Sequence, residues 1–432
     1  MSTNTKLIGN VAAFLVLSFV ALVAIESCSD RRKGERADQR LLEVHARAAE
    51  LGVPRSLRGL VAHRPAVEGA SPFRYLEAIR AITQSDSFAL MDGLGDGFTW
   101  PAYSMRGPDE DSEELAELFA LLPELQADIL GLQEAGVAGP WDEDLQGLSK
   151  LAEVDDELRL SHAFTISSLL SATAYQRTRA GHVDGALQCV DAQFALAETW
   201  RLSLRNHSLL THLALLQQGV DLARQVLPYA EDPAAWMAAL PIRGQVLAID
   251  AEVERVELKA ELTQQLVWFE EALAEVGLLE IAAAARKEGA LALHVLTDSN
   301  SDYLEHHMDL LQAIQLPGPE ALVRADALGK RVRQSDSPLL KLQAPSIEML
   351  LERYLITRSS GQLLRLGVWA LQFESETGAW PSSLSEFAPD FPVDALTGAP
   401  FLVEPEAGGV RVSSSGWASR KSAELTWLLR RP

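Results

Sequence analysis

GHVDGAL, residues 181–187, contains the first break, near His182, in a stretch that is otherwise almost wholly helical in pattern, from Asp156 to Arg358. Further breaks in this stretch lie near Asn206, residues 231–233, Pro241, Gly277, residues 317–319 and residues 336–338. The breaks are about 25 to 40 residues apart, and no alternating run of β-branched residues lies between them. This spacing predicts antiparallel helix hairpins, arranged as a solenoid or a bundle.

Residues 181–187 resemble the turn of a tetratricopeptide hairpin, in which glycine ends one helix and alanine lets the next helix pack closely. The tryptophan and the later proline of that repeat are missing, and the pattern does not recur at a period of about 34 residues. The resemblance therefore implies one hairpin of this general kind rather than a repeat array.

Residues 363–415 predict a small α+β module at the C-terminal side of the helices. An apolar-periodic helix from Leu364 to Phe373 leads to an exit at Gly378, and Ser383 is expected to cap a short second helix. A β-hairpin with its turn at residues 404–409 follows. The predicted fold class is therefore mostly α, with strands confined to this module.

This order resembles the globular part of the major pseudopilins of type II secretion systems, as found at the C-termini of bacterial membrane-anchored proteins. The resemblance rests on Gly378, Trp380, Pro381, Leu384, Pro392, Asp394, Gly398, Pro400 and Phe401. It implies a pseudopilin-like fold and says nothing about an activity. The chain lacks the prepilin-peptidase site and the glutamate that begin a true pseudopilin, so we do not expect assembly into a pilus.

Leu7 to Ile25 forms an apolar run of 19 residues, which points to the membrane. A helix of this length is about 28 Å long and matches a hydrocarbon core of about 30 Å. We expect a retained single-pass anchor, because the run exceeds the usual apolar region of a cleaved signal and no A-x-A site follows. A cleaved signal peptide and a lipoprotein signal with Cys28 as the lipidated residue stay open as alternatives.

The basic residues around the run bear on its orientation. Lys6 precedes it, whereas Arg31, Arg32, Lys33, Arg36 and Arg40 follow it. The positive-inside rule alone would leave the large domain in the cytoplasm. A short basic head before an apolar run is also typical of exported bacterial proteins, and together with the resemblance it favours the extracytoplasmic side of the inner membrane.

The breaks and changes of composition along the sequence divide the chain into four regions. Residues 1–30 are the anchor or signal segment, and residues 31–110 contain N-terminal helices, the first from Asp38 to Leu51, and loops. A polar tether is expected over residues 26–37, across the boundary between these two regions. Residues 111–358 are the helical-hairpin domain, and residues 359–432 contain the pseudopilin-like module. The Gly- and Asp-rich loop at residues 92–110 lacks the ligand spacing of a calcium loop.

Composition excludes several classes of function. The formal net charge of −22 argues against nucleic acid as a partner, because phosphate binding needs clustered lysine and arginine. The two cysteines, Cys28 and Cys189, predict neither a disulfide framework nor a cysteine-based zinc site.

The sequence lacks the usual motifs of zinc proteases, serine hydrolases, P-loop proteins and dinucleotide-binding folds. His207 and His212 are five residues apart, which places them on different faces of a helix. The densest titratable cluster contains Asp302, Glu305, His306, His307 and Asp309. Adjacent histidines point about 100° apart around a helix, so at most one of them could join Asp302 or Asp309 in a site. The glutamates over residues 246–276 are interpreted as the solvated face of a long helix.

We therefore predict no catalytic, cofactor-binding or metal-binding residues. The sequence favours a non-catalytic binding or scaffolding protein of the bacterial cell envelope, attached to the membrane through residues 7–25 and acting on a protein partner. An envelope enzyme of hydrolase type, with a site assembled from distant residues, is one alternative. A cytoplasm-facing anchored scaffold is the other.

Overall fold

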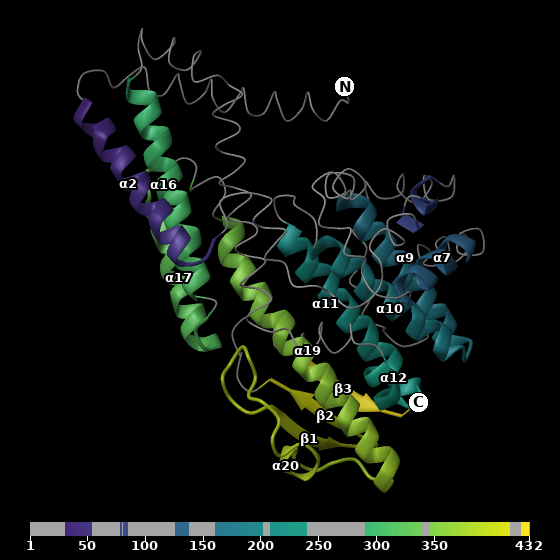
Figure 1. Ribbon diagram of the computed structural model, residues 1–432. Helices are drawn as coiled ribbons and strands as arrows, with labels where there is room; N and C mark the ends of the chain where they lie inside the picture. The colour runs from purple at the N-terminus through teal and green to yellow at the C-terminus, as the bar shows by residue number, and fades with distance from the viewer. Residues whose placement is uncertain are drawn as a thin grey trace. The chain divides into compact units, whose positions relative to one another are not determined.

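The computed structural model describes two compact units (Figure 1). The described residues are 31–53, 78–79, 81–84, 126–137, 160–201, 208–239, 290–313, 315–337, 340, 345–414 and 425–431. Unit 1 comprises residues 1–60, 259–315 and 323–349, and unit 2 comprises residues 61–258, 316–322 and 350–432. Helices take 73% of the described residues, which confirms the mostly α prediction.

The apolar run at residues 7–25 lies outside the described residues. Among the helices that the structure does describe, none combines the length and the apolar character needed to cross a bilayer. The loop at residues 92–110 and the acidic stretch at 246–276 also lie outside the described part of the chain.

In unit 1, helix α2 (Arg31–Glu50) lies along helix α16 (Ala290–Ala313), and most of α17 (Gly318–Gln334) belongs to the same unit (Figure 1). The prediction of a polar tether through residue 37 is wrong over residues 31–37, which are helical. Ala37 is already buried there, and Val44 and Ala48 continue its face about two and three turns later, so tertiary packing extends the helix. The helix ends at Glu50, and Gly52, with a φ of 69°, turns the chain so that the Val53 amide donates back to the Ala48 carbonyl.

The helical part of unit 2 contains α7 (Gln126–Val137), α9 (Leu160–Arg179), α10 (Val183–Arg201), α11 (Ser208–Val226), the 3₁₀ turn η2 (Leu227–Tyr229) and α12 (Pro233–Ala239). Helix α10 packs against α7, α9 and α11. The predicted break near His182 is confirmed, because Gly181 has a φ of 78° and the His182 amide bonds back to the Arg177 carbonyl before α10 begins at Val183. The break at residues 231–233 is also confirmed, and Asp232 caps α12 through the Ala235 amide at 2.8 Å.

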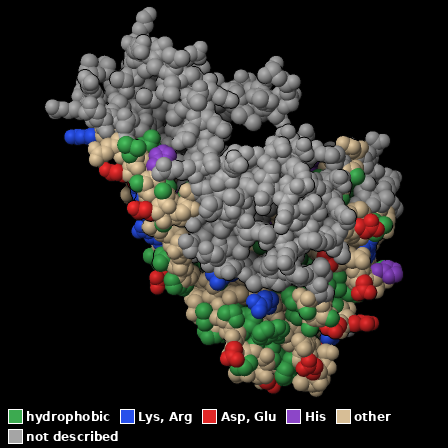
Figure 2. All heavy atoms as spheres, viewed as in Figure 1, with side chains coloured by type: hydrophobic (Ala, Val, Ile, Leu, Met, Phe, Trp, Pro, Cys, Tyr) green, Lys and Arg blue, Asp and Glu red, His purple; other side chains and the backbone are tan. Residues whose placement is uncertain are grey.

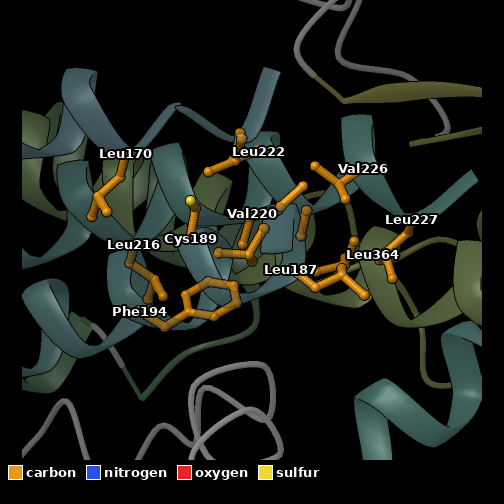
Figure 3. Packing of buried hydrophobic residues seen from close by; sticks show 14 of the residues in the cluster. Leu170, Leu187, Cys189, Phe194, Leu216, Val220, Leu222, Val226, Leu227 and Leu364 are labelled. Carbon is orange, nitrogen blue, oxygen red and sulfur yellow. The ribbon is translucent and has the colours of Figure 1, made fainter. Parts of the chain in front are cut away.

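The core of unit 2 is dense and apolar, as Figure 3 shows around Phe194. Phe194 on α10 is fully buried, and Gly219 on α11 leaves room for its ring. A Cβ atom at residue 219 would lie 2.7 Å from the Phe194 ring, closer than packed carbons approach. The helices therefore meet through small residues and close-packed side chains.

The C-terminal part of unit 2 contains most of α19 (Pro345–Thr377), the short helix α20 (Leu384–Phe387) and three strands. Strands β1 (Leu402–Glu406), β2 (Gly409–Ser413) and β3 (Thr426–Arg430) form one antiparallel sheet in the order β1-β2-β3. Helix α19 is continuous across residue 358, where the sequence predicted a domain boundary.

Three details of this part differ from the predictions. The hairpin turn is tighter than residues 404–409, because pairing continues to Glu406 opposite Gly409 and leaves two residues between the strands. The third strand, β3, was not predicted. Ser383 precedes α20 but makes no capping bond with its side chain, and Glu386 instead accepts the Ser382 amide at 2.6 Å.

One face of the sheet packs on α19, and the other is exposed. Trp427 lies over Gly367, where an added Cβ would lie 1.9 Å from the indole ring. Leu402 and Leu428 lie on the exposed face. The strands lie in the lower part of Figure 1, and Figure 2, seen from the same side, shows hydrophobic side chains gathered in that part of the view. The exposed edge formed by α2 and α16 in the same view instead carries mixed acidic and basic side chains.

Candidate functional site

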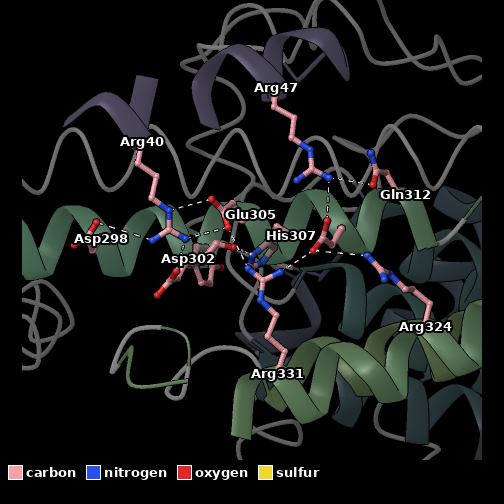
Figure 4. A network of polar contacts seen from close by, with 11 residues as sticks. Arg40, Arg47, Asp298, Asp302, Glu305, His307, Gln312, Arg324 and Arg331 are labelled. Atoms are coloured by element: carbon pink, nitrogen blue, oxygen red, sulfur yellow. Dashed lines mark hydrogen bonds and ion pairs between the residues drawn. The ribbon is translucent and has the colours of Figure 1, made fainter. Parts of the chain in front are cut away.

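The strongest polar constellation among the described residues lies in unit 1 (Figure 4). Helix α16 carries four carboxylates spaced four, three and four residues apart, which places them along one face of the helix. We call Asp298, Asp302, Glu305 and Asp309 the acidic row. Arginines from the two neighbouring helices meet this row, and each helix supplies two of them seven residues apart, which is about two turns.

Helix α2 contributes Arg40 and Arg47. The Nη2 atom of Arg40 lies 2.6 Å from Oδ1 of Asp302 and 3.0 Å from Oε2 of Glu305, and its Nε donates to Oε1 of Glu305 at 3.1 Å. The Arg47 Nη2 donates to Oδ1 of Asp309 at 2.9 Å and to Oε1 of Gln312 at 3.0 Å. Both guanidinium groups therefore make more than one charge-assisted or polar bond to α16.

Helix α17 contributes Arg324 and Arg331. The Nη1 of Arg331 donates to Oδ2 of Asp309 at 2.9 Å, and its Nη2 donates to Oε2 of Glu305 at 3.1 Å. Arg324 lies farther away, with its Nη2 at 3.9 Å from the same oxygen of Asp309. Glu305 and Asp309 thus bind arginines from both neighbouring helices, and they join three helices into one network.

Burial and charge make Asp309 the centre of this network. Its side chain is only 10% exposed, and it pairs with Arg47, Arg331 and Arg324. The hydrogen bond to Glu305, followed by that to Asp302, raises the pKa of Arg40 above its ordinary value against the opposing effect of burial. Four carboxylates face four arginines, so the network is close to neutral and its carboxylates are engaged in binding the helices together.

His306 and His307 lie buried behind the acidic row. The Nδ1 of His307 lies 2.8 Å from the Tyr303 carbonyl oxygen, within hydrogen-bond distance. The centroids of the Tyr303 and His307 rings are 3.9 Å apart. Neither ring nitrogen of His306 has a hydrogen-bond partner among the described groups. Burial lowers the pKa of His306 to about 4, assisted by Arg331 and opposed by Asp309, and burial lowers that of His307 to about 3. Both rings are therefore neutral at pH 7.

The structure separates the other residues that the sequence singled out. His212 is buried and its Nδ1 lies 2.8 Å from the Ala197 carbonyl, so it joins α10 to α11. His207 and Cys28 lie outside the described residues. Cys189 is buried and accepts a bond from Nε2 of Gln133 at 2.9 Å, and burial raises its pKa to about 12, so it is a thiol at pH 7. In the described part of the chain no group of three or more His, Cys, Asp or Glu side chains is placed to hold a metal ion.

A second polar centre, at Asp394 in unit 2, was identified from the sequence only through the resemblance. Its carboxylate is fully buried and accepts hydrogen bonds from the hydroxyls of Ser359 and Ser414, from Oγ1 of Thr397 at 2.8 Å and from the Leu396 amide at 3.0 Å. These bonds tie α19, the turn after α20 and the end of β2 together. Such a fully bonded carboxylate stabilises a fold.

Sequence reasoning found the two histidines and three of the four carboxylates on α16, without Asp298, but missed that four arginines bind the carboxylates. The seven-residue spacing of the arginines on each helix was a usable signal, because it places both members of a pair on one face. The arginines and the acidic row form a network of ion pairs that links α2, α16 and α17, which we call a charged joint. Comparison of the chain with protein-family models, with curated proteins and with solved structures finds no match.

Proposed function

We propose that this protein is a non-catalytic binding or scaffolding protein of the bacterial cell envelope, attached to the inner membrane through residues 7–25. The observation that carries the proposal is the binding of α2 along α16 through Arg40 and Arg47. Helix α2 begins at Arg31, six residues after the apolar run ends at Ile25. The segment next to the proposed anchor is thus built into unit 1 rather than being a loose tether.

A scaffold benefits from this property, because unit 1 then keeps a defined position relative to the bilayer. The ion pairs of Asp309 with Arg47 and Arg331 supply two charge-assisted hydrogen bonds at one well-shielded residue. Charge-assisted bonds of this kind are about twice as strong as neutral ones. The network therefore supports a role in holding the anchor helix firmly.

The helices of unit 2 support the binding half of the proposal. Packed helix pairs such as α9, α10 and α11 present long side-by-side surfaces of the kind that helical-repeat proteins use to bind other proteins. We place the partner, a protein, on these helices. The order of α19, α20 and the three strands also agrees with our proposal of a pseudopilin-like module, which we assign a packing role.

We place the large domain on the extracytoplasmic side of the inner membrane. The test of orientation is protease treatment of spheroplasts and of inverted membrane vesicles that contain the full chain. Digestion in spheroplasts alone supports this placement, and digestion in inverted vesicles alone supports the cytoplasm-facing scaffold.

Membrane attachment is tested by washing membranes with alkaline carbonate. The full chain should stay in the pellet and dissolve only in detergent, and Cys28→Ser should behave identically. Release of uncut chain by carbonate would refute the anchor. Release by Cys28→Ser alone would instead identify a lipoprotein.

Scaffolding is tested by crosslinking the full chain in intact cells at exposed positions of α9 and α12, such as Gln176 and Ala235. One protein crosslinked reproducibly from these sites, and not from exposed Lys330 in unit 1, supports binding through unit 2. Crosslinks that never exceed those of the Lys330 control would contradict it.

A further inference from the structure

Helices α2 and α16 run parallel and in register. Arg40 pairs with Asp302 and Arg47 pairs with Asp309, and both pairs are separated by 262 residues in the sequence. The outer contacts, Arg40 with Glu305 and Arg47 with Gln312, repeat with a separation of 265 residues. Going from Arg40 to Arg47 on α2 therefore corresponds to going from Asp302 to Asp309 on α16, which is seven residues or about 10.5 Å in the same direction on each helix.

The register fixes which end of α16 lies near the start of α2. The separation of 262 residues places Arg31, where α2 begins, level with Leu293, within the first two turns of α16. Between Ile25 and Arg31 the chain spans at most about 20 Å, because an extended chain advances about 3.3–3.6 Å per residue. If residues 7–25 span the membrane, the start of α2 therefore lies within about 20 Å of the end of the anchor, and the start of α16 lies beside it.

The sequence of this end differs from that of the rest of α16. Residues 31–36, RRKGER, contain four basic residues and one acidic residue, and residues 290–297, ALALHVLT, contain no Asp, Glu, Lys or Arg. The acidic row begins only at Asp298. The arginines of α2 and α17 pair with carboxylates of this row. In a chain with a net charge of −22, this end is the part that suits an anionic lipid surface.

We propose that the end of unit 1 formed by residues 31–36 and 290–297 is a second membrane-contact surface, which lies on anionic phospholipid headgroups. The inference rests on the proposed anchor at residues 7–25 and adds to it that α16, far away in sequence, also meets the bilayer. Basic side chains near an anionic leaflet contribute about 1 kcal/mol each, so four of them orient a unit that the anchor alone would leave to rotate.

The test uses the full chain in vesicles of phosphatidylcholine and phosphatidylglycerol that carry a headgroup-attached fluorescence quencher. Cys28→Ser and Cys189→Ala remove the native thiols, and a fluorophore is attached to Ala292→Cys or, as the matched control, to Gln312→Cys. The two positions are 20 residues apart on α16, about 30 Å along its axis. We expect severalfold stronger quenching at residue 292 than at residue 312.

Flotation of the vesicles separates failure of the anchor from failure of the inference. Protein that does not float with the lipid contradicts the proposed function itself. Protein that floats but is quenched equally at both positions, or more strongly at residue 312, overturns the second contact surface and leaves the anchor standing.

The role of charge is tested by changing Arg31, Arg32, Lys33 and Arg36 to glutamine while the anchor is kept. Quenching at residue 292 should fall toward the level at residue 312, and vesicles of phosphatidylcholine alone should give the same loss. Lys330→Gln with Arg333→Gln, on exposed positions of α17, is the control and should leave quenching unchanged. Undiminished quenching after loss of the basic residues would show that anionic headgroups are not the partner.

Discussion

Both units bury apolar side chains between their helices, and unit 1 adds a network of ion pairs to this packing. In unit 1, α2 and α17 contact α16 through arginines that bind Glu305 and Asp309. In unit 2, α10 and α11 meet through Phe194 and the space left at Gly219. Charged joints weaken as carboxylates are protonated or screened by salt, whereas an apolar joint depends on volume. The stability of unit 1 should therefore depend on pH and salt more strongly than the packing around Phe194 in unit 2.

The largest expected effect is in the apolar joint. Phe194→Ala removes a fully buried ring and should lower the free energy of unfolding of unit 2 by about 3–5 kcal/mol, because the cavity cannot close around rigid helices. Denaturant-dependent hydrogen exchange, followed by mass spectrometry in peptides of α10 and α11, measures this loss without assuming that the two units unfold together.

The control for Phe194→Ala is Val323→Ala, on a residue of α17 that is 73% exposed. It should change the stability of either unit by no more than about 0.5 kcal/mol. A loss in unit 2 below about 1 kcal/mol for Phe194→Ala would mean that the core tolerates the cavity and that the apolar joint is looser than its packing indicates.

A smaller loss is expected in the charged joint. Asp309→Ala leaves Arg47 and Arg331 without their common carboxylate and should cost unit 1 about 2–3 kcal/mol, less than a fully buried pair because both arginines reach solvent. Added salt should reduce the difference between wild type and variant. The measurement is the same exchange experiment, read in peptides of α2 and α16 at low and high salt.

The matched control is Asp326→Ala on α17, whose pair with Lys330 at 2.7 Å is exposed on both sides. It should cost far less than Asp309→Ala, because solvent screens an exposed ion pair. Equal losses for Asp309→Ala and Asp326→Ala would remove the distinction between the network and an ordinary surface ion pair.

Local features of the fold were predictable from the sequence, because they follow from single residues. The left-handed backbone at Gly181 and Gly398, with φ of 78° and 68°, marks turns that glycine permits at little steric cost. The C-terminal order of long helix, exit and hairpin was also predicted. Strand β3 was missed, because five residues with inward Trp427 and Leu429 form too short an alternation to identify without their neighbour β2.

The network was only half predictable for a different reason. Asp302, Glu305 and Asp309 lie close together in the sequence and were recognised as a cluster, whereas their partners on α2, Arg40 and Arg47, are more than 260 residues away. The seven-residue spacing on α2 defines a face, but tertiary packing decides which helix covers it. For the same reason the tether prediction failed at Ala37, whose burial depends on unit 1 and not on local pattern.

The smallest expected effect concerns His306, where the two kinds of joint meet in one unit. The folded state holds its pKa near 4, against about 6.5 in the unfolded chain. The unfolded state therefore gains a proton as the pH falls below about 6.5, while the folded state gains it only near pH 4. This histidine's contribution to the stability of unit 1 is full above about pH 6.5 and is lost progressively down to about pH 4.

His306→Leu tests this contribution. At pH 7 the variant should be as stable as wild type or about 1 kcal/mol more stable, because it removes a buried ring whose nitrogens have no hydrogen-bond partner among the described groups. Between about pH 7 and pH 5, where carboxylates stay ionised, wild-type unit 1 should lose about 2 kcal/mol more than the variant. His307 remains in both proteins and keeps its own pH dependence, so the difference isolates His306. An identical loss in both proteins, measured by exchange in α16 peptides, would mean that His306 is protonated as readily in the folded unit as in the unfolded chain.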